Sequence, residues 1–294
     1  MTENLNGTPE NRDRFRRAYT EKHLRELQFA LLDILRHVAR ICEHHDIPYW
    51  LDSGTLLGAV RHGGFIPWDD DIDICIRKED LVRFEQALIQ ELPPHLFLQT
   101  PQSDPQRLPI RKVRNLNSFF VEYKDDFSRD YSKGIYIDIF PMEPWPSFGY
   151  RISRFLAREY SRSNSILHAQ HYYSLRACAE LVYFGSRRLL CKCIWKLGRL
   201  FTGRNKYYSN IIENSGNGFR HLKDTIFPIS RIDFEGESFS APANPDRYLQ
   251  DLFGDYHRLP PEKDRHGHAV FFLTNLVEKE RMDSFFHNTN TVTD

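Results

Sequence analysis

The sequence lacks any long run of apolar residues. Its most apolar stretch, LLCKCIWKLGRLF, is interrupted by Lys192, Lys196 and Arg199 and is too short to span a bilayer. The first residues, MTENLNGTPENRDRFRR, are polar, which argues against a secretory signal peptide. We therefore expect a globular protein of the cytoplasm.

Paired cysteines are also missing. The chain has five cysteines and no C-x-x-C pair, and Cys191 and Cys193 are too close in sequence for an ordinary tetrahedral metal pair. An odd, unpaired set argues against both a disulfide framework and a zinc site. We expect all five to act as small apolar residues.

The chain has no net charge, but its charges are unevenly distributed. Residues 150–206 contain twelve Lys or Arg and only two acids, Glu159 and Glu180, which leaves 28 basic and 38 acidic residues elsewhere. Within this basic segment, helical spacing places Arg188, Lys192, Lys196 and Arg199 on one face and Leu190, Ile194, Leu197 and Phe201 on the other. Such a helix either rests on an anionic membrane or presents a solvated basic face above an ordinary core.

Apolar periodicity predicts a mixed α+β chain. A long amphipathic helix begins near Leu24 and ends near His45, and LVRFEQALIQEL and PDRYLQDLFGDY are shorter helices. Strands are predicted in DIDICI, HLFLQT, RKVRNLNSFFVEY and GIYIDIFPM, and RIDFEGESFSAP is typical of a hairpin. PYWLDSGTLLGAVRH combines a short strand, a Ser-Gly turn and a helix that starts near Thr55. Residues 150 to about 213 are predicted to be helical.

Four aspartates crowd into the stretch IPWDDDIDICI. If this stretch is extended, Asp71 and Asp73 project from one face and the isoleucines from the other, so two carboxylates point at a common place. A divalent cation such as Mg²⁺ would relieve their repulsion and suits phosphoryl transfer. A calcium loop through Asp69, Asp71 and Asp73 is a weaker alternative because Ile74 stands where glycine is needed, and a solvated acidic turn is another.

Two further features support a metal site. Asp138 lies within the apolar strand GIYIDIFP, where a carboxylate needs a partner, either a shared metal or backbone amides. Ser53-Gly54-Thr55 stands where a strand turns into a helix, so its free amides favour phosphate, although the same triplet is an ordinary helix cap.

SGTLLGAVRHGGFIPWDDDIDI closely resembles the signature of the LicD family, whose best-known members transfer phosphocholine from CDP-choline to cell-surface glycans. The resemblance continues in IRKVRN, in GIYIDIFPMEPWP and in the tail from FPISRIDFEGE to HRLPPEK, and it is weakest over 150–213. It implies a nucleotidyltransferase-like mixed sheet flanked by helices. The implied organisation is a polar extension (1–23), a catalytic core (24–149), a basic helical segment (150–213) and a C-terminal hairpin and helix that complete the domain (214–294).

The resemblance also implies site residues. Asp71 and Asp73 would hold the metal, Asp69 would assist directly or through water, and Asp138 would be a further ligand or the general base. Phosphate or substrate contacts would come from Ser53, Gly54 and Thr55 and from a cationic and histidine set: Arg61, His62, Lys112, Arg114 and His266. The stretch Arg265-His266-Gly267-His268 is a further candidate, and Trp50, Trp68 and Trp145 either cage a quaternary ammonium or pack in the core.

These residues predict a transferase that needs Mg²⁺ or Mn²⁺. A hydroxyl of a cell-surface or lipid-linked glycan would attack a CDP-alcohol, with CMP as the leaving group. The alternatives are a nucleotidyltransferase that releases pyrophosphate and a non-catalytic scaffold at a membrane surface. No nucleic-acid readout motif is present. We expect a cytoplasmic protein, with peripheral contact at the inner face of the plasma membrane as an option.

Overall fold

A computed structural model describes residues 9–103, 109–122, 125, 132–146, 148–168, 174–200 and 206–276. Its centre is a mixed sheet in the order β1-β2-β6-β4-β3, in which β7 also pairs with β6, and β8 with β7. β2 and β6 are parallel and the other pairs are antiparallel. The strands of this sheet are β1 Tyr49–Leu51, β2 Asp73–Arg77, β3 Leu96–Gln99, β4 Arg111–Asn115, β6 Tyr136–Pro144, β7 Tyr207–Asn210 and β8 His221–Leu222.

Two small antiparallel pairs flank the sheet. One joins β5 (Phe119–Glu122) to β11 (Ala269–Leu273), and the other is the hairpin of β9 (Ser230–Phe234) and β10 (Glu237–Ala241). The hairpin turns through Glu235 and Gly236, both at positive φ, as tight hairpins require. The predicted hairpin is confirmed.

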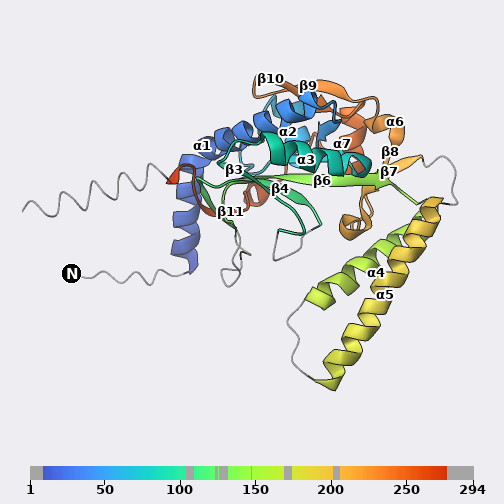
Figure 1. The fold of residues 1–294 in the computed structure, drawn as a ribbon. Coiled ribbons are helices and arrows are strands. Elements are labelled where there is room, and N and C mark those ends of the chain that lie inside the picture. The colour runs from blue at the N-terminus through green and yellow to red at the C-terminus, as the bar shows by residue number, and fades with distance from the viewer. Residues whose placement is uncertain are drawn as a thin grey trace, which may run out of the picture.

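The helices gather in two groups (Figure 1). α1, α2, α3 and α7 cover the sheet, whereas α4 and α5 form a hairpin that projects away from it. The helices are α1 Pro9–His44, α2 Ser53–His62, α3 Leu81–Glu91, α4 Tyr150–His168, α5 Leu175–Leu200, α6 Lys223–Ile226 and α7 Pro245–Phe253. The predicted fold class, α+β with a mixed sheet and flanking helices, is confirmed.

The apolar stripe of α1 explains why this helix covers the sheet. Leu27, Leu31, Ile34, Leu35 and Val38 recur at helical spacing and are buried against the sheet and α3. α7 begins at Pro245, which needs no backbone N–H partner at that position, and the Asn244 side chain accepts a hydrogen bond from the Arg247 amide. The predicted starts of α2 and α7 are therefore close to those observed.

Several predicted boundaries are wrong. α1 begins at Pro9, well before Leu24, the first residue of the apolar pattern that predicted it. RKVRNLNSFFVEY forms two strands, β4 and β5, because the chain turns at residues 116–118. The helical segment ends earlier than residue 213, since β7 occupies 207–210 and joins the sheet. Phe201 and the ends of the chain, 1–8 and 277–294, lie outside the described residues.

Of the four basic residues predicted to share one face of α5, three contact other side chains of the protein and Lys196 is exposed. Lys192 donates to Glu213 at 2.6 Å, Arg188 donates to Asn164 at 3.0 Å, and Arg199 pairs with the buried Glu143. The leucines of the opposite face are the exposed ones, Leu190 by 60% and Leu197 by 49%. Both interpretations of this helix from sequence placed its basic face outward. The acidic partners that turn this face inward, Glu143 and Glu213, lie outside α5.

Within the described part of the chain, no helix has both the length and the unbroken apolar character that crossing a membrane requires.

Candidate active site

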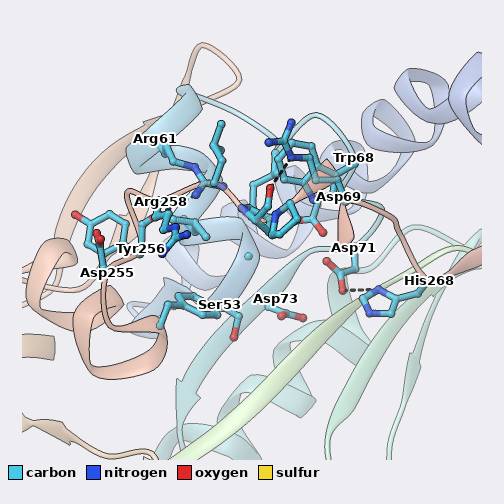
Figure 2. A pocket seen from close by; sticks show the side chains of 18 residues that line it. Ser53, Arg61, Trp68, Asp69, Asp71, Asp73, Asp255, Tyr256, Arg258 and His268 are labelled. Carbon is cyan, nitrogen blue, oxygen red and sulfur yellow. Dashed lines mark hydrogen bonds and ion pairs between the residues drawn. The ribbon is translucent and has the colours of Figure 1, made fainter. Parts of the chain in front are cut away.

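The candidate active site is a pocket of about 870 Å³ above the start of β2 and α2 (Figure 2). Asp69, Asp71 and Asp73 line it together with Ser53 and Gly54, and Figure 2 shows Ser53 close to Asp73. Arg61, Arg258 and Arg265 also line it, together with Trp68, Tyr256 and His268. Carboxylates and guanidiniums therefore face the same space.

The strand register brings Asp73 and Asp138 together. The two are direct partners in the parallel pair of β2 and β6, and Asp138 is in turn paired with Lys112 of β4. Laterally paired residues project from the same face of a sheet, so the three side chains form a row. Lys112 Nζ lies 3.0 Å from Asp138 Oδ1 and partly neutralises this buried carboxylate.

The turn before α2 fixes Asp73 from the other side. The Thr55 hydroxyl accepts a hydrogen bond from the Asp73 backbone amide at 2.8 Å, and the Asp52 amide donates to the Asp73 carbonyl at 3.0 Å. Ser53 adopts a left-handed conformation with φ of 46°, which is uncommon outside glycine. Thr55, predicted to contact substrate, thus positions a carboxylate through its buried hydroxyl.

Gly54 allows Asp69 to come close to the start of α2. A Cβ atom at position 54 would lie 2.8 Å from Asp69 Oδ2, which is too near for an ordinary contact. The carboxylate of Asp69 is therefore held against the N-terminal turn of the helix, beside Ser53.

The carboxylates of this cluster resist ionisation together. Burial, followed by the charges of Asp71 and Asp70, raises the pKa of Asp69 to about 8, and burial raises the pKa of Asp71 to about 6. Burial and the charges of Asp71 and Asp138 hold the pKa of Asp73 well above its usual range. Hard oxygen donors in a group that lacks enough positive charge fit a cation of the Mg²⁺ type.

Asp70 differs from its neighbours because the protein satisfies it. Its Oδ1 accepts the His268 amide at 2.9 Å and its Oδ2 accepts the Ala269 amide at 2.6 Å. Gly267 permits this contact, since a Cβ there would lie 2.2 Å from Asp70 Oδ2. Asp70 therefore ties the loop before β11 to the acidic stretch.

That tie places His268 at the site. Its Nδ1 lies 3.3 Å from Asp70 and 3.6 Å from Asp71, and the pair with Asp71 is drawn in Figure 2. The Asp70 carboxylate raises the pKa of His268 to about 9, so the imidazole is a cation at neutral pH. His266, the residue of this stretch predicted to contact substrate, lines a second cavity, of about 590 Å³, and not the acidic pocket.

The other predicted residues divide between the pocket and the surrounding structure. Arg61 lines the pocket and donates to the Tyr256 carbonyl at 2.9 Å, while His62 lies exposed at the end of α2. Arg114 is buried and donates to Gln99 and to the Gly134 carbonyl, and Lys112 and Arg114 both lie over the Tyr136 ring. In a calcium loop that starts at Asp69, the twelfth position would be Asp80, but Asp80 accepts a hydrogen bond from Arg77, and a strand occupies the place of the loop.

Among the tryptophans, only one contributes to the pocket lining. Trp50 and Trp145 are fully buried core residues, as the packing interpretation predicts. Trp68 lines the pocket, where the Arg265 guanidinium lies 5.2 Å from its ring centroid.

Sequence comparison identifies the domain that carries this pocket. Residues 46–162, which contain the Ser53-Gly54 turn, the acidic stretch and Asp138, match the family model described as LicD/FKTN/FKRP, nucleotidyltransferase domain. The chain is also 27% identical over 266 residues to the lipopolysaccharide cholinephosphotransferase LicD of Haemophilus influenzae, an alignment that covers 84% of this chain and 96% of that protein. Residues 46–162 thus contain a LicD-type nucleotidyltransferase domain.

Shorter matches connect the chain to larger relatives. It is 47% identical over 57 residues to the human ribitol 5-phosphate transferase FKRP, covering 19% of this chain and 12% of FKRP. It is 30% identical over 122 residues to mannosyltransferase regulator 4 of Saccharomyces cerevisiae, covering 39% of this chain and 10% of that protein. The domain match and the similarity to a cholinephosphotransferase confirm the predicted class of enzyme, a transferase of substituted phosphate groups.

The raised pKa values predict how stability changes with pH. A carboxylic acid whose pKa is higher in the folded state favours folding at low pH, and this contribution is lost as pH rises through the folded-state value. Because the pKa values of Asp71 and Asp69 are raised, we expect the Tm of the metal-free protein to fall by roughly 5 °C or more between pH 5 and pH 8. Added Mg²⁺ or Mn²⁺ is expected to raise Tm at pH 8 by most of this amount and to change Tm little at pH 5. Differential scanning fluorimetry checks both trends, and a metal-free Tm that rises over this range would contradict them.

Proposed function

We propose that this protein transfers a phospho-alcohol group, of the phosphocholine type, from a CDP-alcohol to a hydroxyl of a cell-surface or lipid-linked glycan. The relatives support the class of reaction, since one is a lipopolysaccharide cholinephosphotransferase and another a ribitol 5-phosphate transferase. The main support for the proposal is that one pocket contains both an acidic cluster, whose negative charge is only partly balanced, and three arginines.

The two charged sets suit the two parts of a metal-bound diphosphate. Asp71 and Asp73 would hold a divalent cation, with Asp69 beside them, and the cation would neutralise charge that develops on the phosphate oxygens. Arg61 Nε is buried and has no hydrogen-bond acceptor in the described structure, and burial and the nearby Arg265 lower the pKa of Arg61. A diphosphate in the pocket would be an anionic partner for Arg61 and Arg265.

The residues of the chain would then position the reactants. Asp138 would take the proton of the attacking glycan hydroxyl as the new bond to the β-phosphorus forms, and the bond from that phosphorus to the CMP oxygen breaks. Lys112 would keep Asp138 in place through their ion pair. Arg61, Arg258 and Arg265 would hold the CMP phosphate as it leaves, and Trp68 would cover that side of the pocket.

Product analysis tests the proposal. The full chain is incubated with Mg²⁺, a glycan acceptor extract and CDP-choline, CDP-ethanolamine, CDP-glycerol or CDP-ribitol in turn. We expect metal-dependent release of CMP with one donor strongly preferred, and chelation is expected to abolish it. Release of pyrophosphate from a nucleoside triphosphate, without CMP from any CDP-alcohol, would instead identify a nucleotidyltransferase.

A further inference from the structure

The hairpin of α4 and α5 exposes an apolar face that nothing in the described structure covers. On α5, Leu175 is 91% exposed, Val182 70%, Leu189 63% and Leu200 77%. At 100° per residue, these four side chains and the exposed Cys193 lie within about 40° of one direction. Tyr183, Leu190 and Leu197 widen the face to about 120°, and no charged residue falls inside that arc.

The hairpin is folded so that this face has to point outward. Its own small core, which contains Trp145, Leu156, Tyr160, Cys191 and Trp195, uses the opposite side of α5. The Trp195 indole donates to Glu143 of β6 at 2.9 Å, Arg199 pairs with the same glutamate, and Lys192 pairs with Glu213, just after β7. The apolar face of α5 is thus unavailable to the core of the chain, and the hairpin itself stands clear of the sheet in Figure 1.

The charge of the hairpin indicates what covers the face. α4 and α5 together contain ten arginines and lysines and two glutamates, a formal charge of +8. Arg176 and Lys196 border the apolar arc on its two sides, and Arg151, Arg158 and Arg162 are exposed on α4. A second copy would bring two such hairpins together and would be repelled, whereas an anionic lipid surface attracts positive charge and accepts leucines.

We propose that the exposed face of α5 docks this protein on anionic membranes, with its leucines in the headgroup region and its flanking cations on lipid phosphates. This differs from docking through a basic face, because the apolar face makes the contact and most basic residues of α5 remain engaged with the protein. The proposal does not depend on the transfer reaction.

Vesicle binding of the full chain tests the docking surface. The protein is expected to cosediment with vesicles that contain phosphatidylglycerol, and far less with pure phosphatidylcholine. The double variant Val182→Ser/Leu189→Ser is expected to bind roughly tenfold more weakly or worse, since two exposed apolar side chains are removed. The matched control is Val82→Ser/Ile89→Ser on α3, whose parent residues are 67% and 72% exposed, and it is expected to bind like the parent.

A fluorescent label gives a second readout. In a Cys178→Ser background, Cys193 is the remaining exposed cysteine among the described residues, and it lies within the apolar arc. An environment-sensitive dye on Cys193 is expected to shift to shorter wavelength with anionic vesicles. The proposal fails if vesicles do not bind, if the serine variant binds as well as the parent, or if the parent forms a dimer that the serine variant loses. CMP release with a soluble acceptor is expected to be unchanged in the Val182→Ser/Leu189→Ser variant, so failure of docking and failure of the proposed reaction can be told apart.

Discussion

Replacing Asp73 by asparagine is expected to lower kcat by at least about a thousandfold and, in the same protein, to leave the metal-free fold as stable as before or more stable. Asp73 pairs with Asp138 across β2 and β6 and lines the acidic side of the pocket. Burial and neighbouring charges hold the pKa of Asp73 well above its usual range, so a neutral amide of the same shape removes an unfavourable group. The hydrogen bond from the Asp73 backbone amide to the Thr55 hydroxyl does not involve the substituted group and is expected to remain.

The two readouts separate a catalytic role from a structural one. Steady-state CMP release measures the first, and thermal unfolding at pH 8 with a chelator measures the second. Asp233→Asn, the same chemical change at an exposed aspartate of β9, serves as the control and is expected to alter neither. Near-normal turnover in Asp73→Asn would remove Asp73 from the proposed metal site, and a large loss of stability would make it a structural residue.

Much of this site follows from local sequence patterns. The Ser53-Gly54 turn, the acidic stretch and Asp138 were predicted in their order along the chain, and the structure places Asp73 and Asp138 side by side. The reason given for Asp71 was partly wrong, because β2 begins at Asp73 and Asp71 precedes it in irregular backbone. Asp71 still faces the pocket, but the surrounding loops direct it there and strand alternation does not.

The parts that sequence reasoning missed depend on partners far away in the chain. His268 is positioned by Asp70, 198 residues earlier, and no periodicity connects the two. Helical spacing correctly separated the basic and apolar faces of α5, yet it could not tell which of them packs inward. Glu143 and Glu213 decide that orientation, and both lie outside the helix. A signal was available for His268 in the stretch Arg265-His266-Gly267-His268, where Gly267 allows the close approach to Asp70.

The same substitution at Asp70 is expected to change the stability of the protein in the opposite direction from Asp73→Asn. In Asp70→Asn, one carboxylate oxygen that accepts a backbone N–H is replaced by an NH₂ group, which places two donors against each other at a fully buried position. Leaving a buried donor unsatisfied costs about 1–3 kcal/mol, and more where the lost acceptor was charged. We therefore expect Asp70→Asn to destabilise the metal-free protein by about 3 kcal/mol, which lowers Tm by roughly 6–12 °C.

An opposing effect accompanies this loss, because Asp70 also repels the carboxylates of Asp69 and Asp71. Water and the His268 cation at this partly open site screen that repulsion, whereas the Asp70 side chain is fully buried, so we expect the hydrogen-bond loss to dominate. Chemical denaturation of Asp70→Asn and Asp73→Asn, measured side by side at pH 7 with a chelator, checks the opposite signs. Equal stability of the two variants would mean that the four aspartates form one electrostatic group. A loss of stability in Asp70→Asn alone would mean that Asp70 stabilises the fold and that the other three aspartates are available to bind a ligand.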